Sequence, residues 1–361
     1  MYADDPETWD TVPGDNSWDY KNPNTPQPST VNNLLLEQGS LGDGAAGYIY
    51  FYFDNKLGVT ARLYIGGVGP ASLKYMVSET TGPDSDTLSR DGAMQTAAFL
   101  SNLVPGNGLQ QKTLGPPSVT GLPTQIVSYS VSNNTLIQGE MFVTGLTAAA
   151  TFDVYADDCT GTPCPSTHNK NLTGDSHMRR GNFANAEYDL DHNDTTSIET
   201  TGGFAWYDVV GPNSCVGAIN GVDPFGQYTP RNTGDYGVPI IITGTPSTTQ
   251  YWFLMGSPAG MAPGTPDAFS VYVSGLTDPA TGVDVTGAWA VAFPTSNPPT
   301  PSPQPTDTPL ICCAQSAVLG TSATLPRTIE WIPSGGEALP ARFWYNVPVP
   351  KKNIRVQRSH R

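Results

Sequence analysis

Apolar residues recur along most of the chain in short runs, and turn-forming residues separate these runs. Residues 47–54 (GYIYFYFD) are apolar at nearly every position, as expected of a strand buried on both faces. After a turn, residues 59–65 (VTARLYI) alternate, so the two runs predict a hairpin or a corner between two sheets. Residues 125–146 alternate on both sides of Asn133 and Asn134 and predict a second antiparallel pair.

Residues 91–103 (DGAMQTAAFLSNL) have the spacing of a helix instead. Asp91 can cap its start, and Met94, Ala97 and Leu100 recur at helical intervals. Proline and glycine follow at 105–106 and predict where the helix ends. In contrast, we expect residues 31–37 to form at most one short turn.

The second half of the chain predicts further strands, at residues 203–210, 238–243, 250–255, 268–274 and 285–293. The last two runs are joined by a turn-rich connection, and the second run stops at Pro294. We expect this pair to close a β-sandwich, with Trp289 and Phe293 in its core.

About eight or nine strands around one helix indicate an all-β fold, because strands and long helices do not alternate as in a parallel sheet. The expected architecture is an eight-stranded antiparallel jelly-roll sandwich with one or two short helices and extended terminal arms. Residues 1–40 would be an extended acidic N-terminal arm. Residues 41–294 would be the jelly-roll domain, with a long insertion at 151–201. Residues 295–361 would be a Pro-rich linker and a basic C-terminal arm, because PTSNPPTPSPQPTDTP favours extended chain.

Charge is distributed unevenly along this acidic chain, whose formal net charge is −15. The first twenty residues carry six acids and no base, whereas the last eleven carry five bases and no acid. Flexible basic segments neutralise phosphates without reading base sequence. We therefore expect the tail to contact RNA, although a solvated terminus without a partner is the alternative reading. The expected RNA-binding residues are Lys351, Lys352, Arg355, Arg358 and Arg361.

Carboxylates and cysteines cluster in the insertion at 151–201. Carboxylates can form the oxygen cages that Ca²⁺ prefers, but a polar exposed loop explains the same residues. The candidate metal ligands are Asp157, Asp158, Asp189, Asp191 and Asp194. Cys159 and Cys164 are close enough in sequence to form a disulfide, or they are free thiols. Calcium between subunits is the one cofactor that these residues suggest.

Sequence signatures of common enzymes are absent from the chain. There is no Gly-x-Ser-x-Gly elbow and no phosphate-binding Gly-x-x-x-x-Gly-Lys-Ser/Thr loop. The four histidines lie in polar segments or in the tail, and nothing distinguishes a pair of carboxylates. We therefore expect no enzymatic activity. We also expect no signal peptide and no membrane span, since no apolar run approaches about eighteen residues.

The order of these segments resembles the shell domains of nodavirus-like and sobemovirus-like capsid proteins. The resemblance rests on residues 47–54 with their turn, the helix, and the strand from Gln138-Gly139 to Gly145. It also rests on residues 267–275 and 287–293, which resemble the last two strands of nodavirus shells. It covers about residues 40–295, and each of these patterns is weak alone. Size and the acidic N-terminal end are most similar to the coat proteins of dinoflagellate-infecting dinornaviruses (alvernaviruses).

The resemblance implies a major capsid protein that assembles with itself into an icosahedral T=3 shell around single-stranded RNA. It further implies a receptor on the host surface and assembly of virions in the host cytoplasm. Related shells carry an Arg-rich N-terminal arm, which this chain lacks, so the C-terminal tail would supply the RNA contacts. The alternative is an extracellular carbohydrate-binding β-sandwich module with a Pro/Thr linker, in which Trp206 and Trp252 would stack on sugars.

Overall fold

A computed structural model of the chain is dominated by β-strands. Among the residues it describes there is a single helix, α1, so the prediction of an all-β sandwich is confirmed. The described residues are 1–3, 8–9, 34–83, 87–103, 106–118, 121–157, 181–183, 186–189, 199–201, 204–210, 219–224, 226, 229–232, 237–244, 250–256, 267–274, 287–293, 316–322, 327–332 and 341–346.

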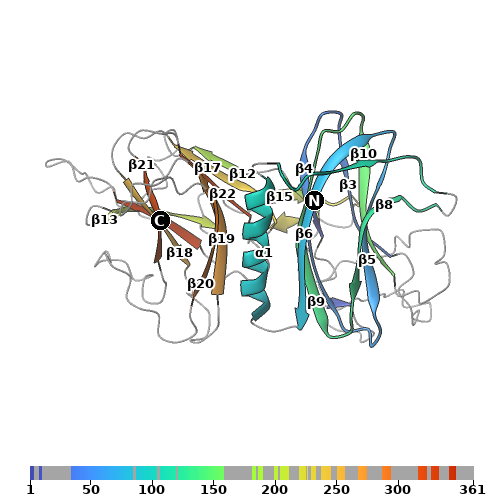
Figure 1. The fold of residues 1–361 in the computed structure, drawn as a ribbon, viewed down its shortest axis with the longest axis horizontal. Helices are drawn as coiled ribbons and strands as arrows, with labels where there is room; N and C mark the ends of the chain where they lie inside the picture. Colours follow the sequence, from blue (N-terminus) through green and yellow to red (C-terminus); the bar gives the residue numbers. More distant parts are fainter. Residues whose placement is uncertain are drawn as a thin grey trace.

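The first eight long strands form one sandwich of two sheets, at one end of the molecule in Figure 1. One sheet has the order β3-β10-β5-β8 and the other contains β4-β9-β6-β7. The strands are β3 (Leu34–Leu41), β4 (Gly47–Asn55), β5 (Ala61–Val68), β6 (Ser72–Pro83), β7 (Gln110–Thr113), β8 (Thr124–Val131), β9 (Thr135–Thr144) and β10 (Ala150–Asp157). The helix α1 (Thr87–Leu103) is inserted between β6 and β7.

This strand order is that of a jelly roll. If β3 to β10 are numbered one to eight, the sheets run 1-8-3-6 and 2-7-4-5, with all neighbours antiparallel. Two interlocked Greek keys produce this order. The jelly roll therefore closes at β10, within the segment that we had assigned to an insertion. The expected shell-domain boundaries of 41–294 are wrong for this reason.

Large apolar side chains from both sheets fill the jelly-roll interior. Phe51 and Phe53 of β4 and Ile137 of β9 are fully buried there. Gly139 permits close contact, because a Cβ at this position would lie 2.6 Å from the Phe51 ring and from the Ser78 carbonyl oxygen. The run at 47–54 is continuously apolar because both faces of β4 are covered.

The turns after β4 and after β8 both carry the chain from one sheet to the other. The second pair predicted from residues 125–146 is therefore a corner and not a hairpin, since β8 and β9 belong to different sheets. The two corners hydrogen-bond to each other. The Asn134 amide donates to the Asn55 carbonyl at 2.6 Å, and the Gly58 amide donates to Asn133 Oδ1 at 2.8 Å.

Residues near the N-terminus extend one sheet of the jelly roll. Strands β1 (Tyr2–Ala3) and β2 (Thr8–Trp9) both pair in parallel with β4. Trp9 is fully buried against Phe53, with ring centroids 5.0 Å apart. The expected acidic arm at 1–40 is therefore wrong for these four residues and for β3, which is the first strand of the jelly roll.

Ten further strands form two five-stranded sheets, which we call the C-terminal module. One sheet has the order β12-β17-β22-β19-β20 and the other β13-β14-β23-β18-β21. The first contains β12 (Ala186–Asp189), β17 (Ile240–Gly244), β22 (Arg327–Trp331), β19 (Asp267–Ser274) and β20 (Gly287–Phe293). The second contains β13 (Glu199–Thr201), β14 (Phe204–Val210), β23 (Ala341–Asn346), β18 (Gln250–Gly256) and β21 (Ser316–Ser322).

The middle strand of each sheet in this module comes from beyond the Pro-rich tract. β22 lies between β17 and β19, and β23 lies between β14 and β18. Residues 316–322, 327–331 and 341–346 are thus strands, and their assignment to a linker and arm is wrong. The antiparallel pairing of β19 with β20 agrees with the predicted pair, but it belongs to this module and not to the jelly roll.

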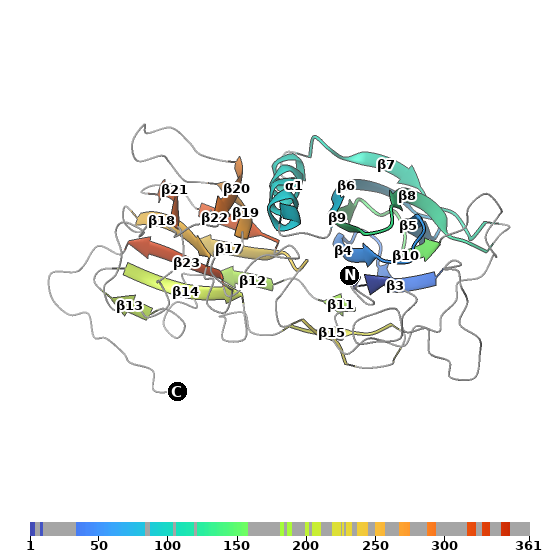
Figure 2. The same cartoon turned by 90° about the horizontal axis from the view of Figure 1, so that it is seen from below.

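Helix α1 lies between the jelly roll and the C-terminal module in both views (Figures 1 and 2). It packs against β6 and β9 on one side and against β19 and β20 on the other. A small three-stranded sheet of β11 (Asn182–Phe183), β15 (Ile219–Val222) and β16 (Arg231–Asn232) lies beside the jelly roll. Within the described residues, no helix has the length and apolar character needed to cross a bilayer.

Candidate functional site

The outer face of β9 supplies the polar centre of the junction between the jelly roll and α1. Along this strand Ile137, Met141 and Val143 face the jelly-roll core, so the intervening residues Gln138 and Glu140 face the helix. Both polar side chains are only 1% exposed. Their burial under a helix places one ionisable carboxyl group, that of Glu140, and one amide inside this contact.

Glu140 is held by two consecutive residues of α1. The Thr96 hydroxyl donates to Glu140 Oε1, and Gln95 Nε2 donates to Oε2 at 2.5 Å. Burial raises the pKa of Glu140 to about 7, from an ordinary value of 4.5, and the two hydrogen bonds oppose this shift only in part. Desolvation penalises the charged form, so this carboxyl changes its protonation state near neutral pH.

The Gln138 side chain contacts α1 at Gly92, where only a residue without a side chain leaves enough space. A Cβ at Gly92 would overlap the Gln138 amide. Glycine is otherwise unfavourable inside a helix by about 1 kcal/mol relative to alanine. The local sequence therefore gives up helix propensity at Gly92 so that α1 can lie close to β9.

An apolar cluster beside these polar residues joins the jelly roll to the C-terminal module. Met76 of β6, Phe99 and Leu100 of α1, and Ile332 next to β22 are all buried in it. Tyr48 and Phe142 pack against the cluster, with their rings 4.9 Å apart. Ile332 is the residue of the module that the structure places in this contact.

A second contact between the two parts forms just before β17. Gly237 has a φ of 66°, and a Cβ there would overlap Tyr50 of the jelly roll. Tyr50 stacks on Tyr2 at 5.2 Å with nearly parallel rings. Val238 is 3% exposed. Close contact at this point thus depends on glycine both for its conformation and for its size.

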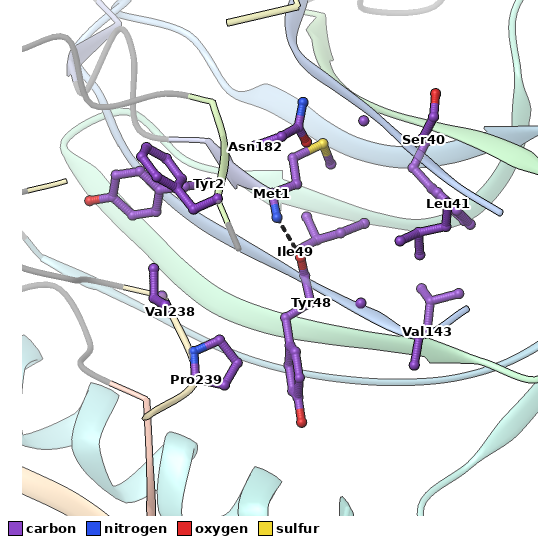
Figure 3. A pocket seen from close by; sticks show the side chains of 16 residues that line it. Met1, Tyr2, Ser40, Leu41, Tyr48, Ile49, Val143, Asn182, Val238 and Pro239 are labelled. Atoms are coloured by element: carbon purple, nitrogen blue, oxygen red, sulfur yellow. Dashed lines mark hydrogen bonds between the residues drawn. The ribbon is translucent and has the colours of Figure 1, made fainter. Parts of the chain in front are cut away.

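A cavity of about 340 Å³ opens at this second contact (Figure 3). Its wall combines β1, β3 and β4 of the jelly roll with residues 182–183 and 237–239. The Met1 amino group donates to the Tyr48 carbonyl at 2.7 Å, and Asn182 Nδ2 donates to the Gln38 carbonyl at 2.9 Å. Most of the lining is apolar: Leu41, Ile49, Val143, Phe152, Val238 and Pro239.

The far side of the jelly roll carries a different polar group, on the outer face of the sheet that contains β10. Tyr64 and Tyr155 stack there at 4.9 Å, and Gln38 Nε2 donates to Asp153 at 2.8 Å. Burial raises the pKa of Tyr64 and of Tyr155. Asp157 lies at the end of the same strand and is 4% exposed.

Two of the five predicted metal ligands lie within the described part of the chain, on strands of different sheets. Asp157 ends β10 of the jelly roll, whereas Asp189 ends β12 of the C-terminal module. Asp158, Asp191 and Asp194 lie outside the described residues. Across the described part of the chain, no three His, Cys, Asp or Glu side chains are grouped as metal ligands would be. Calcium binding by these carboxylates stays a prediction.

The predicted RNA-binding residues and all five cysteines also lie outside the described residues. The two tryptophans proposed to stack on sugars are described only through their backbone. Trp206 pairs with Trp344, which in turn pairs with Phe253, while the neighbouring Trp252 pairs with Tyr345. Positions 206 and 252 therefore lie on β14 and β18, two strands apart in one sheet and out of register with each other.

Sequence reasoning missed the junction residues. Glu140 stands as a single acid in the run TLIQGEMFVT, whose other residues are uncharged. The available signal was one acid within a strand that is covered on both faces. This signal can be recognised only once it is known that α1 packs on the outer face of β9.

Comparisons with known proteins assign no family. No protein-family model and no curated protein matches this chain. Among solved structures, the CUB1-EGF-CUB2 domain of human MASP-1/3 is 9% identical, with 86% of this chain and 99% of that chain covered at a TM-score of 0.17. The CBM22-1-CBM22-2 tandem domain of Paenibacillus barcinonensis Xyn10C is 10% identical, with 88% and 89% covered at a TM-score of 0.12. These two similarities are too weak to support a function, so the functional proposal rests on the fold and contacts of this chain.

Proposed function

We propose that this chain is the subunit of an icosahedral viral shell, in which the jelly roll forms the wall and the C-terminal module forms a second layer or projection. The observation that carries the proposal is the strand order of the jelly roll, 1-8-3-6 over 2-7-4-5, with one helix between the fourth and fifth strands. Jelly rolls of this kind build viral capsids, and they also occur in lectins and cupins.

A shell subunit acts through buried area and symmetry and needs no catalytic centre. The two contacts at Ile332 and Gly237 support such a role, because a subunit with two parts must hold them in a fixed relation to repeat regularly. The T=3 arrangement, the single-stranded RNA cargo and the host receptor belong to the same proposal.

The basic tail extends the proposal to the RNA cargo. Five cations in the last eleven residues contrast with a net charge of −15 for the chain. In a shell of acidic subunits, such tails would gather at the inner surface and neutralise phosphates by releasing counterions. Calcium at subunit contacts remains a further part of the proposal.

The deciding experiment is the assembly state of the full chain. Purified protein would be followed by sedimentation velocity and negative-stain microscopy between pH 5 and 8 and at low and high salt. Closed particles of uniform diameter are the expected result. A monodisperse monomer under every condition would overturn the proposal, and glycan binding by that monomer would favour the carbohydrate-binding alternative.

A further inference from the structure

The contact between β9 and α1 contains a carboxyl group that is shielded from water and has no cation paired with it among the described side chains. Glu140 is 1% exposed, and its hydrogen bonds come only from the neutral donors Gln95 and Thr96. Among the residues whose side chains the structure describes, no lysine, arginine or histidine is paired with it. A buried carboxylate without a cationic partner is costly, so such groups tend to take up a proton.

The strands on either side of Glu140 and the helix that covers it carry other polar residues. Across the sheet its register partners are Tyr50 on β4 and Ser78 on β6. On α1 the acidic residue Asp91 is exposed at the surface, one turn before Gln95. Glu140 is therefore the group at this contact whose charge changes around pH 7.

We propose that Glu140 is a protonation-dependent latch: its neutral acid fastens α1 to the jelly roll, and its ionisation loosens the helix together with the contact that the helix makes with the C-terminal module. The geometry connects these events, since the same helix packs on β6 and β9 with one side and on β19 and β20 with the other. Phe99 and Leu100 of the same helix share a buried apolar cluster with Ile332 of the module.

The direction of the pH effect follows from linkage. The pKa of Glu140 is about 7 when α1 is seated, and it returns toward 4.5 when the helix opens and water reaches the carboxyl. Between these two values the seated form holds one proton more than the open form. Seating is therefore strongest below about pH 4.5, weakens as pH rises to about 7, and changes little above that.

The side chains around Glu140 allow its protonated form to keep hydrogen bonds to α1. A protonated Glu140 can donate to the Thr96 hydroxyl, whose own hydrogen can then turn to the carbonyl one turn back in the helix, a common threonine contact. Gln95 Oε1 is buried and has no hydrogen-bond partner among the described residues. Rotation of this amide by half a turn gives Glu140 a second acceptor.

Hydrogen exchange of the full chain tests the latch directly. The measured quantity is the protection of the α1 peptide (87–103) relative to the β4 peptide (47–55) in the same molecule, corrected for intrinsic exchange, from pH 4.5 to 8. For the unaltered protein we expect relative protection to fall by up to about tenfold per pH unit between pH 5 and 7. Glu140→Gln should remove this dependence, and the surface control Asp91→Asn should retain it.

Thr96→Val provides a second variant that keeps the carboxyl, in case Glu140→Gln does not fold. Loss of the Thr96 hydrogen bond, which favours the charged form, should move the pH midpoint upward. Equal pH dependence in the unaltered protein and Glu140→Gln would overturn the proposal, as would constant protection of α1 across the range. The measurement uses separate subunits, so its outcome does not depend on whether the chain assembles into shells.

Discussion

Gly237 lies directly against the Cβ atom of Tyr50, at a point where the C-terminal module meets the jelly roll. Its φ of 66° belongs to the left-handed region that glycine adopts without strain. Two separate requirements, backbone conformation and the lack of a side chain, therefore meet at one residue of the contact. The stability of the whole chain should therefore respond to this position.

Gly237→Ala is expected to destabilise the contact by about 1–3 kcal/mol, because the added methyl group must displace Tyr50 and the backbone becomes strained. Denaturant unfolding followed by tryptophan fluorescence measures the change. Gly226→Ala is a suitable control, since Gly226 has a similar φ of 67° but open space around its Cβ position. Equal losses in the two variants would show that overlap with Tyr50 contributes nothing.

Gly92→Ala should destabilise the protein, although alanine is the better helix former. Helix propensity alone favours alanine by about 1 kcal/mol, but the overlap with Gln138 costs more than this gain. Shortening the facing side chain should reverse the sign. In a Gln138→Ala background we expect Gly92→Ala to stabilise the protein, and thermal unfolding of the four proteins in this cycle measures the coupling. An identical effect of Gly92→Ala in both backgrounds would contradict the close contact.

Asn134 is the one non-glycine residue with positive φ among the described residues, at 57°. Asparagine tolerates this conformation better than alanine, so Asn134→Ala should cost about 1 kcal/mol. Asn134→Gly keeps the backbone amide that donates to Asn55 and should change the melting temperature little. If glycine destabilises as much as alanine, the side chain and not the backbone conformation determines the corner.

Deletion of residues 351–361 should lower the RNA content of purified particles while leaving both parts of the chain folded. The reason is that five of the chain's 17 lysine and arginine residues lie in this segment. The ratio of absorbance at 260 and 280 nm, with extraction of the nucleic acid, measures the change, and the melting temperature serves as the control for folding. Unchanged RNA content in particles of the deletion variant would contradict a role of this tail in binding RNA.

The sequence pattern predicted individual strands and the helix better than it predicted which strands pair with each other. Strand β4 was predictable because its apolar run is continuous, and helix α1 was predictable because its apolar residues recur at helical spacing. β10 was assigned to an insertion because Asp153 and Asp157 interrupt its apolar pattern, and both are buried on the outer face of its sheet. β6 was missed for a related reason, since its second half is polar.

The predicted domain boundaries were wrong at the Pro-rich tract, where they rested on amino-acid composition alone. A Pro-rich tract predicts extended chain, and from this we inferred the end of a domain. The strands that follow it, β22 and β23, nevertheless occupy the middle of both sheets in the C-terminal module. Strand pairing between residues far apart in sequence leaves no local trace, so no reading of the tract itself could have revealed this.

The position of these two middle strands sets an order of events during synthesis. The jelly roll has all eight of its strands once residue 157 has left the ribosome, and its helix is already in place to cover one sheet. The C-terminal module has no central strand in either sheet until residues 327–346 emerge. Domains generally fold as units during translation, N-terminal first. The jelly roll can thus form while one side of α1 is still uncovered, and β22 and β23 later complete the two sheets of the C-terminal module.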